Sequence, residues 1–153
     1  MPSRIQTGRK PAALKSRDFL AEVVELTQMQ LPDGLRDVQV VGPVFSLVKL
    51  HYGDPAVHYE VWLQRRAGLV EVGLHFEGAP DANARQLAAL SRHAEEIVDS
   101  LGPTVELEQW TASWTRVHEH LRMEALDEDL LLVVSQRLAA FVRVLEPMVR
   151  AGR

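Results

Sequence analysis

Two neighbouring stretches in the middle of the chain alternate between apolar and mostly polar residues. In Val57–Arg65 the apolar residues occupy the odd positions, and in Leu69–Glu77 they occupy the even positions. Period-two alternation with β-branched and aromatic residues is typical of a half-buried strand. We therefore predict a β-hairpin joined by Arg65-Arg66-Ala67-Gly68. The predicted cross-strand pairs are Leu63–Val70, Val61–Val72, Tyr59–Leu74 and Val57–Phe76 on one face, and Trp62–Glu71 and His58–His75 on the other.

Helical spacing of apolar residues predicts three helices around this hairpin. They run from Ser16 to a stop at Pro32-Asp33-Gly34, from Pro80 or Asp81 to Gly102-Pro103, and from Asp127 to Pro147. Valine-rich or alternating stretches predict strands at 44–50, 105–109 and 114–121, with an irregular or bulged edge at 38–41. The order α-β-β-β-α-β-β-α favours an α+β fold, because helices and strands do not alternate one for one. We expect an antiparallel sheet of about five strands with helices packed on one face.

Composition restricts the classes of function. The 153 residues fit a single domain, expected over 16–149, after a basic disordered tail at 1–15. There is no cysteine, which excludes disulfides, thiolate metal ligands and a cysteine nucleophile. Met1–Arg17 holds five basic residues and no acidic residue, so the other 12 of 17 basic residues stand against all 21 acidic residues. We expect nucleic-acid binding only through the tail, no membrane partner and a cytoplasmic location.

The polar face of the predicted sheet is the candidate binding surface. It collects all three tryptophans and four of the six histidines of the chain. Exposed tryptophan carries a large apolar area and is enriched at recognition surfaces, although an indole can also serve as a flat lid packed on a sheet. The alternation assigns to this face His58, Glu60, Trp62, Gln64, Glu71, His75, Glu77, Glu106, Glu108, Trp110, Trp114, Arg116, His118 and His120.

A metal site is a sharper alternative on the same face. His118 and His120 lie two residues apart, so a strand directs both imidazoles to one side. With His58 and His75 opposite each other, and Glu60 or Glu71 nearby, three nitrogens and a carboxylate could meet around an ion. Scattered histidines also meet by chance, and the order of the strands is unknown. We therefore assign no cofactor from sequence and retain these four histidines only as candidate ligands.

Acid–base chemistry needs a recessed pocket that shifts a carboxyl pKa. Glu60, Glu71 and Glu77 could cluster, but we expect an open and solvated sheet face, so no catalytic residue is assigned. No nucleophile elbow, dinucleotide fingerprint or phosphate-binding loop occurs.

The segment from Val70 to Leu145 resembles an uncharacterised prokaryotic domain family. The resemblance rests on the strand Val70–Gly78, the helix Arg85–Gly102 with its paired acids and leucine–glycine end, the strand Val105–Trp110 that ends in tryptophan, and the helix ending in FVRVLEP at 141–147. Members of that family sometimes follow nuclease domains of the restriction type. The resemblance implies an accessory role in a DNA-related or defence system.

The interpretation that we favour is a non-enzymatic domain that binds across the helix-free sheet face. Its expected partner is another protein chain or a second copy of itself, because the last helix is apolar almost all round and the tryptophans face outward. The alternatives that remain are an enzyme or metal-binding protein with a His/Glu-lined pocket, and the accessory role that the resemblance implies.

Overall fold

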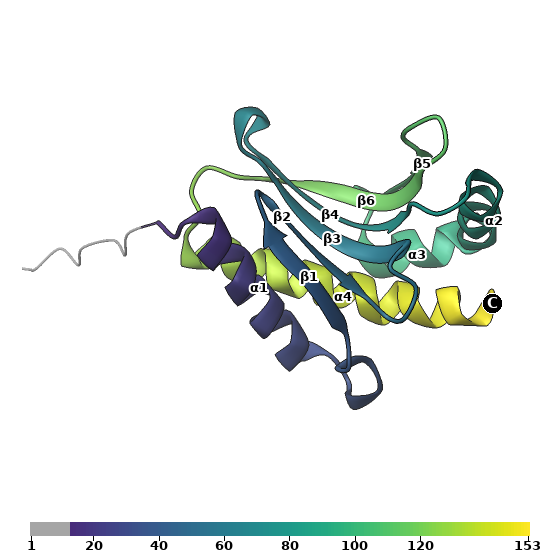
Figure 1. The fold of residues 1–153 in the computed structure, drawn as a ribbon, viewed down its shortest axis with the longest axis horizontal. Helices are drawn as coiled ribbons and strands as arrows, with labels where there is room; N and C mark the ends of the chain where they lie inside the picture. The colour runs from purple at the N-terminus through teal and green to yellow at the C-terminus, as the bar shows by residue number, and fades with distance from the viewer. Residues whose placement is uncertain (1–12) are drawn as a thin grey trace, which may run out of the picture.

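The structure is a computed structural model that describes residues 13–153 (Figure 1). Most of the predicted basic tail lies outside the described residues. Short 3-10 turns follow α1 and join β3 to β4. The helices and strands are α1 (Ser16–Gln30), β1 (Gln39–Val44), β2 (Leu47–His51), β3 (Val57–Gln64), β4 (Leu69–Phe76), α2 (Pro80–Ser91), α3 (Ala94–Leu101), β5 (Glu106–Gln109), β6 (Thr115–Arg122) and α4 (Glu128–Ala151).

The strands form one antiparallel sheet in the order β1-β2-β3-β4-β6-β5. The predicted α+β class is confirmed, but the sheet has six strands, because the valine-rich segment folds into a hairpin of its own. A bulge between Val41 and Val44 absorbs Gly42-Pro43, directly after the segment 38–41 where we predicted an irregular or bulged edge. The register of the β3–β4 hairpin is the predicted one, including His58 opposite His75 and Trp62 opposite Glu71.

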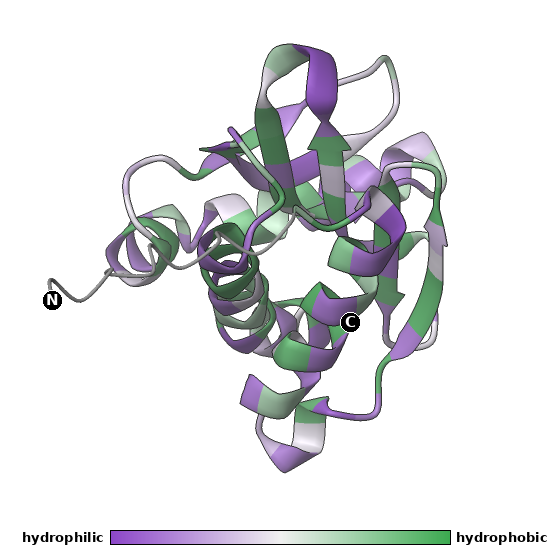
Figure 2. Ribbon diagram, turned by 90° about the vertical axis from the view of Figure 1, so that its left-hand side faces the viewer, coloured by the Kyte–Doolittle hydropathy of each residue, from purple (hydrophilic) through white to green (hydrophobic). Residues whose placement is uncertain are grey.

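The helices cover one face of the sheet, as predicted, and α4 runs below β3 and β4 in Figure 1. Hydrophobic and hydrophilic residues alternate along the strands (Figure 2). The apolar residues of β3 and β4 meet Phe19 of α1, Ile97 of α3 and Phe141 of α4 in a continuous core. Each buried Leu, Ile or Phe of this kind stabilises the fold by roughly 1.5–3 kcal/mol relative to an exposed position. The opposite face therefore carries the polar half of each alternating strand.

Two predicted helix boundaries are wrong. The long second helix is two helices, because the chain leaves helical geometry at His93 (φ −107°, ψ 19°) before α3 begins. Pro147 does not end the last helix, which continues to Ala151. Burial of Leu145 and Val149 holds the turns around the proline against the core. None of the helices in the described part of the chain is long and apolar enough to span a membrane.

Candidate functional site

The helix-free face gathers its polar side chains in three rows across β3, β4, β6 and β5. Antiparallel pairing places opposite residues about 4.5–5.5 Å apart at Cβ, so the members of a row contact one another. The loops between β3 and β4 and between β5 and β6 rise from the sheet on this side (Figure 1). The rows are Trp62–Glu71–His120, Glu60–Gly73–His118–Glu106 and His58–His75–Arg116–Glu108.

The centre of this face is buried, in contrast to the open surface expected from the sequence. His58 is 2% exposed, Glu60 5% and His75 0%. Trp110, just beyond β5, lies edge-on to the His75 ring with centroids 5.5 Å apart. The Arg116 guanidinium lies 4.5 Å from the centre of the Trp110 ring. A lid of aromatic and long side chains therefore removes the central carboxylates and imidazoles from water, which strengthens every charge interaction among them.

His75 is at the centre of the cluster and bridges two carboxylates. Its Nε2 lies 3.2 Å from Glu71 Oε1, and its Nδ1 lies 3.0 Å from Glu77 Oε2. Burial alone lowers the pKa of His75, but the hydrogen bonds to Glu71 and Glu77 and the charge of Glu60 raise that pKa to about 9. In the metal-free protein His75 is therefore an imidazolium at neutral pH, with both nitrogens donating.

Glu71 links the two halves of the face. Burial raises its pKa, but the hydrogen bond from His75 and the charge of Arg116 bring the pKa below its usual value. Arg116 donates from Nη1 to Glu71 Oε1 at 2.7 Å and from Nη2 to Glu108 Oε1 at 2.6 Å. This double ion pair, in which Glu71 is buried and the Glu108 side chain is 35% exposed, links β6 to β4 and β5.

His58, Glu60, His75 and Glu77 form a group whose ligand atoms all lie within 4.8 Å of one another. His58 Nδ1 lies 3.0 Å from the carbonyl oxygen of Pro55, which can only accept, so Nδ1 carries the proton in the neutral ring. The Nε2 lone pair then points toward Glu60 Oε1 at 3.5 Å and Glu77 Oε2 at 3.7 Å. No hydrogen bond satisfies this buried nitrogen within the described residues. Metal-binding histidines characteristically donate their second N–H to a carbonyl or carboxylate in this way.

A second group on the same face consists of Glu106, Glu108 and His118. His118 Nε2 lies 2.8 Å from Glu108 Oε1, but the alignment is too poor for a hydrogen bond, so both ring nitrogens of this buried histidine are unsatisfied. Burial and the charge of Arg116 lower the pKa of His118. His120, predicted as a fourth candidate ligand, belongs to neither group and packs edge-on against His118. Glu106 is exposed, so this group is the more solvated of the two.

Gly73 occupies the middle row between Glu60 and His118 and leaves the floor of the face open. A Cβ at this position would lie 2.7 Å from His118 Cβ and 2.9 Å from the Val117 carbonyl oxygen, too close for any side chain. An isolated glycine within a strand pattern often marks a close approach of this kind. Here it lets β6 approach β4 closely at the middle row and adds no side chain among the carboxylates and imidazoles.

The three tryptophans, predicted to form a recognition surface, are separated by the structure into two locations. Trp110 and Trp114 pack against each other at the β5 end, with centroids 5.9 Å apart, and Trp114 is the exposed member. Trp62 lies at the other end of the face, in the row of Glu71. Trp110 and Trp114 therefore form a lid at the β5 end, and the three tryptophans do not make one continuous apolar patch.

Two residues that the sequence reasoning left out also belong to the face. The alternation of Leu47–His51 puts Lys49 and His51 on the polar side, and the pairing of β2 with β3 brings them to Glu60 and His58. Lys49 Nζ lies 3.9 Å from Glu77 Oε1. This alternation was visible in the sequence, but nothing in the sequence identified β2 as the neighbour of β3 on its open side.

Comparisons with protein-family models, with curated proteins and with solved structures found no match to this chain.

Proposed function

We propose that this domain binds a divalent transition-metal ion through His58, Glu60, His75 and Glu77. His75, an imidazolium in the metal-free protein, gives up one ring proton to the solvent when it ligates the ion. The observation that carries the proposal is the geometry of the His58 ring. Its Nδ1 is fixed by a backbone carbonyl, and its buried, unsatisfied Nε2 is directed at two carboxylates. A lone pair facing carboxylate oxygens is repelled unless a proton or a metal ion lies between them, and Nε2 makes no hydrogen bond to either carboxylate within the described residues.

The ligand types support a borderline ion. Imidazole nitrogen suits zinc, iron, nickel and copper, and carboxylate oxygen suits harder ions such as manganese. A mixed set without thiolate favours Zn²⁺, Fe²⁺ or Mn²⁺ over Cu⁺ or an iron–sulfur cluster. The proposal concerns binding and includes no reaction, and it uses the helix-free face that the sequence identified.

The test is a zinc titration of chelator-treated protein by isothermal titration calorimetry, with thermal unfolding in parallel. The expected result is one Zn²⁺ per chain and a zinc-dependent rise in melting temperature, because a ligand that binds only the folded state stabilises it. Manganese and ferrous iron are titrated in the same way to rank the ions.

Matched variants locate the ion. His58→Gln removes the ligand whose geometry carries the proposal and is expected to weaken zinc binding at least about tenfold. His120→Gln removes a histidine of the same face that belongs to neither group, and it should leave the affinity unchanged. Equal effects of the two substitutions, or no binding by the unaltered protein, would refute the proposal. Loss of zinc in His118→Gln with retention in His58→Gln would place the ion in the second group and refute it as well.

A second candidate function is self-association through β1, the edge strand. Val40, Val41 and Val44 are exposed, and Phe45, in the turn after them, is 93% exposed. Exposed apolar edge strands pair with other chains, although here the bulge at Gly42-Pro43 restricts backbone pairing to the first half of the strand. These side chains support a homodimer better than the tryptophans do.

Phe45→Asn tests this candidate, because asparagine tolerates the positive φ of 53° at this position. Light scattering over a range of concentrations is expected to show a dimer for the unaltered chain and a monomer for the variant. A monomer at every concentration of the unaltered chain would exclude this function.

A further inference from the structure

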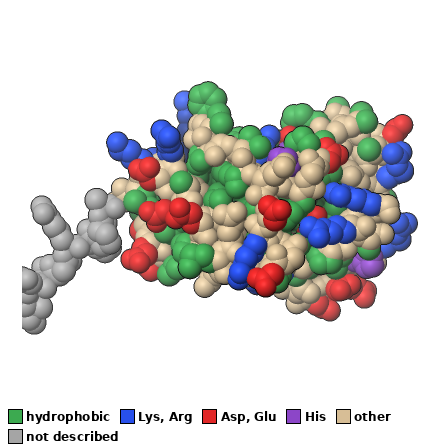
Figure 3. Space-filling view, turned by 60° about the horizontal axis from the view of Figure 1, so that its bottom comes forward, with side chains coloured by type: hydrophobic (Ala, Val, Ile, Leu, Met, Phe, Trp, Pro, Cys, Tyr) green, Lys and Arg blue, Asp and Glu red, His purple; other side chains and the backbone are tan. Residues whose placement is uncertain are grey.

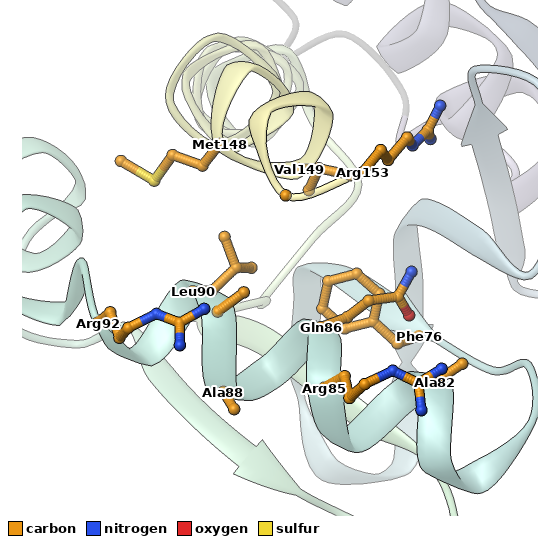
Figure 4. A pocket seen from close by; sticks show the side chains of 12 residues that line it. Phe76, Ala82, Arg85, Gln86, Ala88, Leu90, Arg92, Met148, Val149 and Arg153 are labelled. Carbon is orange, nitrogen blue, oxygen red and sulfur yellow. The ribbon is translucent and has the colours of Figure 1, made fainter.

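A cavity of about 530 Å³ lies on the helix side of the molecule, between α2 and the last turns of α4. This volume falls within the roughly 300–1,000 Å³ of typical small-molecule sites. Phe76 of β4 and Leu90 of α2 project into it from below, and Met148 and Val149 close it from above (Figure 4). The cavity is separated from the histidine and glutamate cluster by the sheet itself, because Phe76 points to the opposite face from its neighbours His75 and Glu77.

Small residues line the cavity where α2 meets the end of α4. α2 carries Ala82 and Ala89 on this side, and Gly152 follows the last residue of α4. A Cβ built on Gly152 would lie 3.9 Å from Ala89 Cβ, so the two helices approach closely here with little side-chain volume between them. The lining of the cavity is predominantly apolar, as expected for a site that holds a hydrocarbon group.

Arginines surround this apolar interior. Arg85 and Arg92 lie seven residues apart on α2, two turns and about 10 Å along the helix, and Arg153 follows the end of α4. Figure 4 places Arg85 and Arg153 toward one end of the cavity and Arg92 toward the other. In Figure 3 basic side chains gather over the end of the molecule that carries α2 and the C-terminal turns of α4.

These arginines have no acidic partner among residues 13–153. The arginines that form ion pairs there are Arg36, Arg116, Arg137 and Arg150, none of which lines the cavity. Asp81, one turn before Arg85 on α2, does not come within ion-pair distance of it. Unpaired guanidinium groups beside an apolar space are complementary to a molecule with an anionic head and an apolar body.

We infer that this cavity binds a straight-chain carboxylate of the fatty-acid type. The hydrocarbon chain lies between α2 and α4 against Phe76 and Leu90, and the carboxylate is held at the rim of the cavity by the exposed guanidinium of Arg85. The inference is independent of the proposed metal site, since the two sites share no side chain and lie on opposite faces of the sheet.

The test is displacement of the fluorescent anionic dye anilinonaphthalene sulfonate from the full chain by ligands that differ in one feature each. Dodecanoate should displace the dye at concentrations below micelle formation. Dodecanol, which has the same chain without the charge, should be at least about tenfold weaker, because it lacks the charge-assisted hydrogen bonds. Acetate, which has the head without the chain, should not displace the dye.

Three arginine variants assign the head group. Arg85→Gln should weaken dodecanoate binding about tenfold and leave dodecanol binding unchanged. Arg92→Gln should have a smaller effect on dodecanoate. Arg66→Gln, an exposed arginine of the β3–β4 turn that does not line the cavity, should have none. Circular dichroism and melting temperature confirm that each variant folds, which is expected because the altered side chains are exposed.

Equal displacement by dodecanoate and dodecanol, or unchanged dodecanoate affinity in Arg85→Gln, would refute the inference. An absence of displacement by dodecanoate would refute it too. Zinc affinity measured on Arg85→Gln keeps the two proposals apart, since it should equal that of the unaltered protein.

Discussion

His75 makes the stability of the metal-free protein fall as the pH rises above neutrality. The pKa of this histidine is raised from 6.5 to about 9 in the folded chain. A raised histidine pKa contributes stability that is fully present below the unfolded pKa and is lost as the pH passes through the folded pKa. The vulnerable range is therefore about pH 7 to 9.5, where the imidazolium that bridges Glu71 and Glu77 loses its proton.

The magnitude follows from the shift. Each unit of pKa difference corresponds to about 1.4 kcal/mol, so the difference between 6.5 and about 9 corresponds to about 3.5 kcal/mol. His75 is completely buried, so solvent screening does not reduce this value much. Since some deprotonation has already occurred in the unfolded chain at neutrality, about 2 kcal/mol remains to be lost between about pH 7 and about pH 9.5.

Chemical denaturation in the presence of a chelator measures this loss directly. The free energy of unfolding is determined for the unaltered protein and for His75→Gln, which hydrogen-bonds but does not titrate. The gap between the two should shrink by about 2 kcal/mol from about pH 7 to about pH 9.5. Tyr52 does not interfere, because burial raises its pKa to about 12. The lowered pKa of His118 acts only below neutrality.

A pH-independent gap would show that His75 is not charged in the folded protein. A gap that widens with pH would reverse the sign of the argument. In either case the description of the cluster as carboxylates held together by an imidazolium would be wrong.

Three further substitutions probe how the face and the core are assembled, each measured by chemical denaturation. Gly73→Ala should destabilise the fold by about 2 kcal/mol or more, because the added methyl group would overlap the backbone of β6. A variant as stable as the unaltered protein would contradict the close approach of β4 and β6. Tyr59→Phe should cost about 1–2 kcal/mol, since it removes a 3.0 Å hydrogen bond to the buried Glu146, and a neutral effect would mean that Glu146 is satisfied without it. Arg137→Met should cost about 3 kcal/mol by leaving buried Glu119 without its ion pair, and Arg137→Lys should recover only part of this loss.

The sequence predicted the central hairpin correctly because its alternation admits one register. A slip of one residue between β3 and β4 would move Tyr59 and Leu74 from the core to the polar face, so the hydrophobic effect selects the observed pairing. The same logic predicted which residues share the polar face. The helix predictions failed at two places. At Pro147 tertiary packing outweighs the local preference of proline, and at His93 no glycine or proline marks the break.

The candidate site could not be predicted, because its geometry depends on which strands are neighbours and on what covers them. His58 and His75 were expected to lie opposite each other. The contact of Glu71 with Arg116 exists only because β6 pairs with β4, a long-range arrangement that periodicity does not encode. The burial of the cluster was missed because its cover comes from Trp110. This residue lies just beyond β5, and the alternation had placed it on the same face as an exposed side chain. Alternation gives the direction of a side chain, but not its exposure.

Charge balance within the cluster shows where a cation is lacking. Glu71 shares Arg116 with Glu108, and Glu77 is bound by His75. Glu60 remains.

Glu60 is 5% exposed, makes no hydrogen bond through its carboxylate among the described residues, and lies 3.5 Å from the unsatisfied His58 Nε2 and 3.7 Å from His75 Nε2. Burying a carboxylate without a full partner costs free energy in the metal-free state, and functional sites commonly carry such a cost.

Glu60→Gln, which keeps the shape and removes the charge, should therefore leave the metal-free protein equally stable or about 1 kcal/mol more stable. The same substitution should weaken zinc binding at least about tenfold, because a ligand oxygen and its charge are gone. Glu106→Gln, at the exposed edge of the face, provides the matched control and should change neither quantity. If Glu60→Gln instead destabilises the metal-free protein as strongly as His75→Gln does near neutral pH, then Glu60 is an essential partner of the imidazolium. The cluster would then be a self-sufficient ion-pair network that does not need a metal.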